Sequence, residues 1–244
     1  YIGIWAISPK HLFADNLKDE LWLVAGGVFG GSLYFFTENT ALGITQASNV
    51  AFIICTAPLL TTILSLLFYK SEKATKGLIY GSLLALIGVG LVVFNGSVVL
   101  KLSPVGDLLT LLAALSWAFY SLVIKRMTGR YPTVFITRKI FFYGVLTILP
   151  AFLLHPLQPD FDVLLQPLVL SNLLFLAVLA SLICYILWNV VLKQLGTMRA
   201  SNYIYLNPLV TMVASVLILH EQITWITLMG AACIILGVYL AEKK

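Results

Sequence analysis

The sequence predicts an all-α protein embedded in a membrane, and three observations lead to that prediction. Hydrophobic residues make up 60% of the 244-residue chain, charged residues make up 10%, and the mean hydropathy is +0.99. A soluble domain has about 25% charged residues and needs a polar surface that this composition does not supply. Apolar blocks alternate with short polar connections, and the positive residues gather in every second connection.

Eight apolar blocks are long enough, or nearly so, for a membrane-spanning helix, which needs about 20 residues to cross the hydrocarbon. Ile140–Leu154 is the shortest of them, and a further apolar stretch at Tyr1–Ser8 is interpreted as the end of a truncated span. We expect spans at about Leu21–Leu42, Ala47–Phe68, Leu78–Asn95, Val105–Ile124, Ile140–Leu154, Val169–Leu192, Ala200–Leu219 and Ile223–Leu240.

The positive charges predict an orientation for these spans. When successive connections are placed on alternate sides of the membrane, fourteen of the fifteen Lys and Arg residues fall on one side and only Lys101 on the other. Lys and Arg near span ends mark the cytoplasmic face, so we expect a cytoplasmic C-terminus. Arg138 and Lys139 are expected to extend to the lipid headgroups. Because the charges flank spans, we predict a lipid bilayer and no nucleic acid as partner.

The two halves of the chain resemble each other. The repeated pairs are Asn39 and Asn189, Leu42 and Leu192, and Pro58 and Pro208 at an offset of 150, then Glu72 and Glu221, Gly81 and Gly230, and Gly88 and Gly237 at an offset of 149. The alternation of sides gives the halves opposite orientations, as in many secondary transporters. We therefore predict an inverted repeat of five-helix bundles, residues 1–104 and 105–244. It would have ten helices when intact, the first repeat being truncated at its N-terminus.

An ordered set of short motifs carries a family resemblance. The set comprises Leu115-Ser116-Trp117-Ala118-Phe119-Tyr120, Leu187-Trp188-Asn189 with Lys193-Gln194-Leu195-Gly196, Ala200 to Pro208, Glu221, and Gly230 with Gly237. It resembles the EamA family of the drug/metabolite transporter superfamily. The resemblance implies a ten-helix permease of the bacterial inner membrane, often an exporter of amino acids or other small metabolites.

Several residues are candidates for a solute pathway. Proline removes a backbone donor and displaces the carbonyl four residues earlier, so Pro58 and Pro208 predict two helix breaks at a shared cavity. Aromatic and amide side chains in such a cavity would suit a small amphipathic solute or its ammonium group. The alternative is that these residues only kink or pack helices. The aromatic and amide candidates are Asn207, Tyr203, Trp117, Tyr120 and Tyr185.

Three further polar residues are candidates for gating or proton coupling. Glu38 is the one acid well inside an expected span, where a carboxylate is expensive to insert and often functional. Asn39 and Asn189 are repeat-related and lie toward opposite membrane faces, as alternating gates would. Simple structural hydrogen bonds are the alternative for all three residues.

The favoured function is secondary active transport of small metabolites by alternating access. An intramembrane lipid-modifying enzyme, a protease or a channel is the alternative. His11, His155 and His220 lie in connections, and the chain has no catalytic, metal-binding or Walker motif, so we expect no enzymatic activity, no metal and no cofactor. Protons are the candidate coupling ion, and the pattern is compatible with a homo-oligomer.

Overall fold

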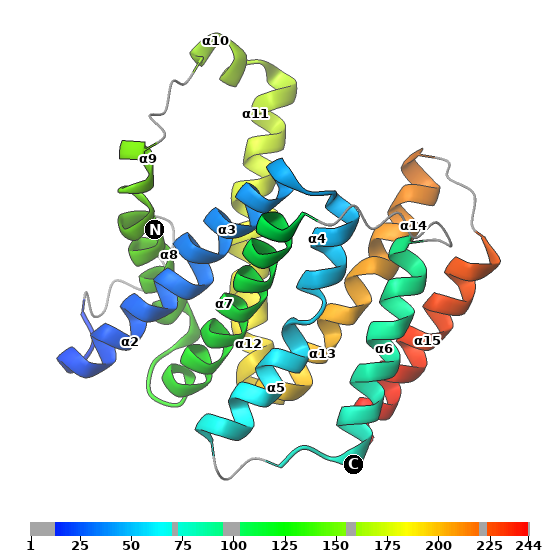
Figure 1. Ribbon diagram of the computed structural model, residues 1–244. Coiled ribbons are helices and arrows are strands. Elements are labelled where there is room, and N and C mark those ends of the chain that lie inside the picture. The colour runs from blue at the N-terminus through cyan, green and yellow to red at the C-terminus, as the bar shows by residue number, and fades with distance from the viewer. Residues whose placement is uncertain (1–12, 70–72, 95–102, 155–159, 220–223, 244) are drawn as a thin grey trace.

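The computed structural model describes residues 13–69, 73–94, 103–154, 160–219 and 224–243, and these residues form helices and no strand (Figure 1). The expected partial span Tyr1–Ser8 and the repeat pair Glu72 and Glu221 lie outside the described residues. In chain order the elements are α2 (Leu17–Gly27), the π-helix η1 (Val28–Ser32), α3 (Leu33–Ile44), α4 (Ala47–Ile54), α5 (Ala57–Phe68), α6 (Lys76–Phe94), α7 (Pro104–Thr128), α8 (Thr133–Ile148), α9 (Ala151–Leu154), α10 (Phe161–Leu164), α11 (Pro167–Leu174), the π-helix η2 (Phe175–Ile183), α12 (Cys184–Leu195), α13 (Thr197–Asn202), the 3-10 helix η3 (Tyr203–Leu206), α14 (Asn207–Leu219) and α15 (Trp225–Glu242).

Within the described residues, five helical stretches are long and apolar enough to cross a membrane. They are Ala47–Phe68, Lys76–Phe94, Pro104–Thr128, Pro167–Leu195 and Trp225–Glu242. Each matches a span expected from the sequence to within a few residues. Many of their large apolar side chains are exposed, which is the arrangement that a hydrocarbon solvent requires. The all-α membrane class is therefore supported by the helices themselves.

Helix α8 begins earlier than the apolar pattern predicted. It starts at Thr133, directly after Pro132, and not at Ile140. The expectation that Arg138 and Lys139 extend to the headgroups is wrong, since they are only 1% and 2% exposed. The reason is that Lys139 meets a carboxylate, Glu20, from the first turn of α2 inside the bundle.

The positively charged connections gather at one end of the bundle. The C-terminal end of α5, the N-terminal end of α6, the connections α7–α8 and α12–α13 and the C-terminal end of α15 all lie at the lower end of the view (Figure 1). We call this end the basic end. It is defined by Lys125, Arg126, Arg130, Lys193, Arg199 and Lys243.

Two of the spans expected from the sequence, Ala47–Phe68 and Ala200–Leu219, are broken near their middles, and the breaks carry the two prolines. Helix α4 ends at Ile54 and α5 begins at Ala57, with Pro58 in its first turn. Likewise η3 leads into α14, whose second residue is Pro208. Proline is tolerated in a first helical turn because the backbone N–H there needs no partner within the helix. The prolines thus begin new helices and do not kink continuous ones.

Helices α6 and α15 pack along their lengths through glycines. A Cβ atom added to Gly81 would lie 2.4 Å from the carbonyl oxygen of Gly237. One added to Gly88 would lie 2.6 Å from the carbonyl oxygen of Gly230. The two backbones therefore touch directly, as small residues allow between membrane helices.

Candidate solute cavity

A cavity of about 270 Å³ lies where the two broken spans meet α3, α7 and α12. A water molecule occupies about 30 Å³ of liquid, so the space could hold a solute of several heavy atoms. The cavity is lined by Tyr34, Ile54, Ala57, Ala114, Trp117, Trp188, Tyr203, Ile204 and Asn207.

Three of the candidate pathway residues line this cavity, namely Trp117, Tyr203 and Asn207. The prolines lie beside it without lining it, since Pro58 follows Ala57 and Pro208 follows Asn207. Both prolines are buried. The residue directly before each proline, Ala57 or Asn207, therefore lies at the cavity wall.

Trp117 of α7 is the centre of an aromatic cluster. Its ring centroid lies 5.1 Å from those of Tyr34 and Tyr120 and 5.8 Å from those of Tyr185 and Trp188. Tyr120 and Tyr185 do not line the cavity but pack behind Trp117. They thus fix the orientation of a wall residue.

A buried polar layer lies on the basic side of the cavity. Tyr120 donates a 2.7 Å hydrogen bond to Asn189 Oδ1, and Asn189 Nδ2 donates a 2.9 Å bond to Thr137 Oγ1. All three side chains are fully buried. We call Tyr120, Thr137 and Asn189 the polar layer. Tyr120 is three residues nearer than Trp117 to the basic end of α7, a rise of about 4.5 Å.

Hydrogen bonds connect the π-helix η1 to α7 and α12 in the second half of the chain. Ser116 Oγ donates to the carbonyl oxygen of Phe29 at 2.8 Å, and the Tyr185 hydroxyl donates to that of Gly30 at 2.6 Å. A Cβ atom on Gly30 would lie 2.3 Å from the Tyr120 ring. The π-helix η1 therefore packs against Tyr120 and Tyr185, which lie behind Trp117, and π-turns often occur at functional sites.

Glu38 reaches the cavity through a neighbour on its own helix. Tyr34 lines the cavity, and its hydroxyl donates a 3.1 Å hydrogen bond to Glu38 Oε1. Asn39, which the sequence analysis paired with Asn189, is exposed, and its side-chain nitrogen donates a hydrogen bond to the carbonyl oxygen of Phe35 in its own helix. The two asparagines therefore have unlike surroundings in the described structure.

Ile54 and Ile204, four residues before the two prolines, also line the cavity, and the sequence analysis missed the remaining four lining residues: Tyr34, Ala57, Ala114 and Trp188. Two signals could have found the aromatic pair. Tyr34 precedes Glu38 by one helical turn, and Trp188 precedes Asn189 in a motif already noted. The two alanines carry no chemical signal, because they contribute space and not a functional group.

The lining described here has aromatic rings, one amide and no Lys, Arg, Asp or Glu side chain. It can offer ring faces to a cation and hydrogen bonds from Asn207 and Tyr203. Among the described residues, no three His, Cys, Asp or Glu side chains come together as metal ligands. A lining of this kind has the size and chemistry to hold a small, partly apolar molecule.

Comparison with known proteins decides the family. The model of the EamA-like transporter family matches residues 1–94 and 104–242. The chain belongs to the EamA-like transporter family. Its members with similar sequences include an uncharacterized transporter of Archaeoglobus fulgidus, 26% identical over 98% of this chain and 82% of that protein.

Two further EamA relatives carry informative names. The uncharacterized transporter YyaM of Bacillus subtilis is 30% identical over 96% of this chain and 75% of its own length. A Salmonella typhimurium protein named "Probable amino-acid metabolite efflux pump" is 27% identical over 95% of this chain and 80% of its own length. The fold is also found in a crystal structure with a TM-score of 0.75 and 19% identity, over 91% of this chain and 75% of the other. These names describe transporters, and the apolar helices agree with a multi-pass membrane protein.

Proposed function

We propose that this EamA protein is a secondary active transporter that exports amino acids or related small amphipathic solutes by alternating access. The observation that carries the proposal is the cavity at the junction of the two broken spans. Discontinuous helices that meet near the membrane midplane are where secondary transporters bind their solutes. The name of the Salmonella relative supports the amino-acid class.

An inverted repeat of residues 1–104 and 105–244 is part of this proposal, and three features support it. The π-helix Val28–Ser32, shifted by 150 residues, falls within the second π-helix, Phe175–Ile183. The helix breaks at Pro58 and Pro208 have the same offset. The family model also matches in two segments that divide near residue 104.

The glycine contacts supply a fourth support for the inverted repeat. Gly81 contacts Gly237, the repeat mate of Gly88, while Gly88 contacts Gly230, the repeat mate of Gly81. A two-fold axis between the helices produces this reciprocal pattern, because each helix then presents the same surface to the other. Such an axis would lie in the membrane plane, and the positive-inside rule would put the basic end and the C-terminus in the cytoplasm.

Counterflow in proteoliposomes tests the transport proposal. Vesicles preloaded with an unlabelled amino acid should accumulate the labelled amino acid transiently and with saturation, because a carrier exchanges solutes across one site. A channel would instead give a current that rises linearly with voltage, and an enzyme would convert the solute. Either result, without saturable exchange for any amino acid or related metabolite, would contradict the proposal.

Asn207→Ala tests the assignment of the cavity. The substitution removes the amide from the cavity wall, so exchange should fall by about tenfold or more if the amide contributes a hydrogen bond worth about 1.5 kcal/mol to solute binding. Asn172→Ala is the matched control, because Asn172 is exposed on α11. Membrane abundance of both variants should equal that of the wild type. Wild-type exchange by Asn207→Ala would remove Asn207 from the site.

A further inference from the structure

We infer that a charged latch between α2 and the α7–α8 region holds the cavity closed toward the basic end and must part when the cavity opens there. The inference rests on the proposed transport function. The basic-end latch consists of Asp19, Glu20, Arg130, Tyr131, Lys139 and Tyr143. Neither carboxylate was a candidate from the sequence, where both precede the first complete apolar block.

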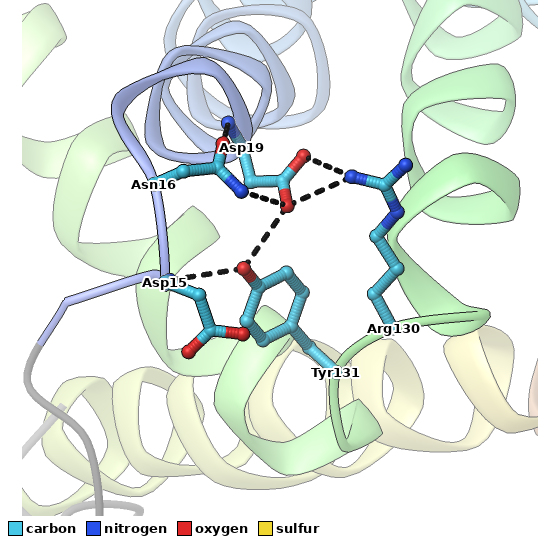
Figure 2. Close-up of polar contacts among 5 residues, drawn as sticks. All are labelled: Asp15, Asn16, Asp19, Arg130 and Tyr131. Carbon is cyan, nitrogen blue, oxygen red and sulfur yellow. Dashed lines mark hydrogen bonds and ion pairs between the residues drawn. The ribbon is translucent and has the colours of Figure 1, made fainter.

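Asp19 is the centre of one half of the latch (Figure 2). Arg130 Nη1 lies 2.9 and 3.0 Å from its two carboxylate oxygens, and the Tyr131 hydroxyl donates to Oδ2 at 3.0 Å. Asn16 Nδ2 donates to the same oxygen at 2.9 Å. Asp19 is 1% exposed, whereas the Arg130 side chain is 53% exposed. The pair therefore joins a buried anion to a cation that already meets solvent.

The neighbouring residue, Glu20, forms the other half. Its Oε1 accepts hydrogen bonds from Lys139 Nζ and from the Tyr143 hydroxyl, and its Oε2 accepts one from the backbone N–H of Ala14 at 2.7 Å. Lys139 also lies 5.2 Å from the centroid of the Tyr143 ring. Adjacent carboxylates on one helix thus hold two different segments, the α7–α8 connection and α8.

The latch connects the two halves of the proposed inverted repeat. Asp19 and Glu20 belong to residues 1–104, while their partners belong to residues 105–244. Alternating access requires the halves to move against each other around the cavity. A contact that crosses between the halves at one end must therefore change during the cycle.

The chemistry of the latch suits a contact that opens and closes. The Lys139 and Glu20 side chains are only 3% and 14% exposed, and a buried ion pair contributes little net stability compared with apolar packing, because desolvation offsets the attraction. The Asp19–Arg130 pair is weakened instead by solvent screening of the half-exposed Arg130. When the pair separates toward water, each charge regains its hydration, and the exposed Arg130 needs little movement to do so. The free energies of the closed and open states can then be similar, as a switching element requires.

Other contacts on the basic side of the cavity are also closed. The polar layer of Tyr120, Thr137 and Asn189 lies directly on the basic side of the cavity wall. Between the two broken spans, Ser65 Oγ of α5 and Thr197 Oγ1 of α13 are 3.1 Å apart and fully buried. The structure thus has its basic side sealed at several positions, of which the latch is the one held by charge.

The test measures from which side a cysteine in the cavity can be reached. Cys55, Cys184 and Cys233 are replaced by serine or alanine, and Ala114→Cys provides one thiol on the cavity wall. A membrane-impermeant thiol reagent is applied to inside-out vesicles and, separately, to right-side-out vesicles. Arg130→Gln should raise the labelling rate from the basic side by at least about fivefold, the lower range of typical coupling between two states. Labelling from the opposite side should fall.

Three further variants make the result decisive. Arg130→Lys keeps the charge and should label much like the parent. Tyr131→Phe removes a single hydroxyl and should shift labelling in the same direction as Arg130→Gln, but less. Arg199→Gln removes a basic-end cation outside the latch and should leave labelling unchanged. Equal labelling of Arg130→Gln and its parent from both sides, with the protein folded and monodisperse, overturns the latch.

The assay separates this inference from the proposed function because labelling needs no transported solute. If labelling shifts as expected and no solute exchanges, the latch stands and the transport proposal fails. If exchange is saturable and labelling does not shift, transport stands and the latch fails. Should Arg130→Gln not fold, the direction of the shift in Tyr131→Phe decides.

Discussion

The Tyr120 hydroxyl donates a 2.7 Å hydrogen bond to Oδ1 of Asn189, and neither side chain has exposed surface. The amide nitrogen of Asn189 donates a 2.9 Å hydrogen bond to Thr137 Oγ1. One asparagine therefore connects α7, α8 and α12 in the polar layer. Because Asn189 is buried and its partners are buried with it, removing its side chain should lower the free energy of unfolding.

We expect Asn189→Ala to lower the free energy of unfolding by about 1–3 kcal/mol, because it leaves buried polar groups without their partner. Asn39→Ala is the matched control, since Asn39 is the repeat mate but is exposed and bonded within its own helix. That change should stay within about 0.5 kcal/mol. Denaturant unfolding in detergent measures both. Equal losses at the two positions would contradict the layer.

Gly81→Ala should separate α6 from α15. The new methyl group would meet the Gly237 carbonyl oxygen at 2.4 Å, and backbone atoms cannot move aside as a side chain can. Overpacking of this kind costs about 1–3 kcal/mol. Gly43→Ala is the control because nothing lies within 4 Å of an added methyl there. A thermal midpoint of Gly81→Ala equal to or above that of Gly43→Ala would show that the contact is unimportant.

Hydropathy and charge placement predicted the membrane class and the position of most spans, because both are one-dimensional properties, and the resemblance carried by the ordered motifs predicted the family. Sequence reasoning failed at α8, where a buried ion pair let Lys139 lie inside the bundle and the apolar pattern started seven residues too late. For the cavity it identified Trp117, Tyr203 and Asn207 but placed Tyr120 and Tyr185 at the wall. Trp117, which lines the cavity, and Tyr120, which packs behind it, are only one helical turn apart. The packing between helices determines which of the two rings reaches the cavity, and the sequence does not show that packing.

The role of Glu38 as a proton carrier stays a prediction, and Glu38→Gln tests it. If the carboxyl group carries the coupling proton, the variant should still exchange solute in counterflow but lose the pH dependence of net export. Tyr34→Phe is the control, because it removes the hydrogen bond to Glu38 and keeps the ionisable group. Retained pH dependence in Glu38→Gln would leave Glu38 with a structural role only.

Asp19 should make the thermal stability of the protein depend on pH in the acid range. It lies before the span expected from Leu21. Burial disfavours its charged form, yet hydrogen bonds from Arg130, Asn16 and Tyr131 outweigh burial and hold its pKa below the ordinary 3.8. A carboxyl group whose folded pKa is lower than its unfolded pKa stabilises the protein above the unfolded value. That contribution is lost as pH falls through the folded value.

The thermal midpoint of the wild type should therefore exceed that of Asp19→Asn at neutral pH, and the gap should close as the pH falls below about 4. Scanning fluorimetry in detergent at several pH values measures the gap. A gap that stays constant across this range would mean that the contacts of Asp19 do not depend on its charge.

The π-helix η1 sets the rotational phase between the two ends of one span. Asp19 lies on its basic side and Tyr34 on its cavity side. Each residue of a helix turns the chain by about 100°, so deleting one residue from Val28–Ser32 would rotate everything beyond it by that angle. Tyr34 would then point away from the cavity while Asp19 kept its partners. The number of residues in Val28–Ser32, more than the identity of their side chains, therefore determines how the two ends of this helical stretch are rotated relative to each other.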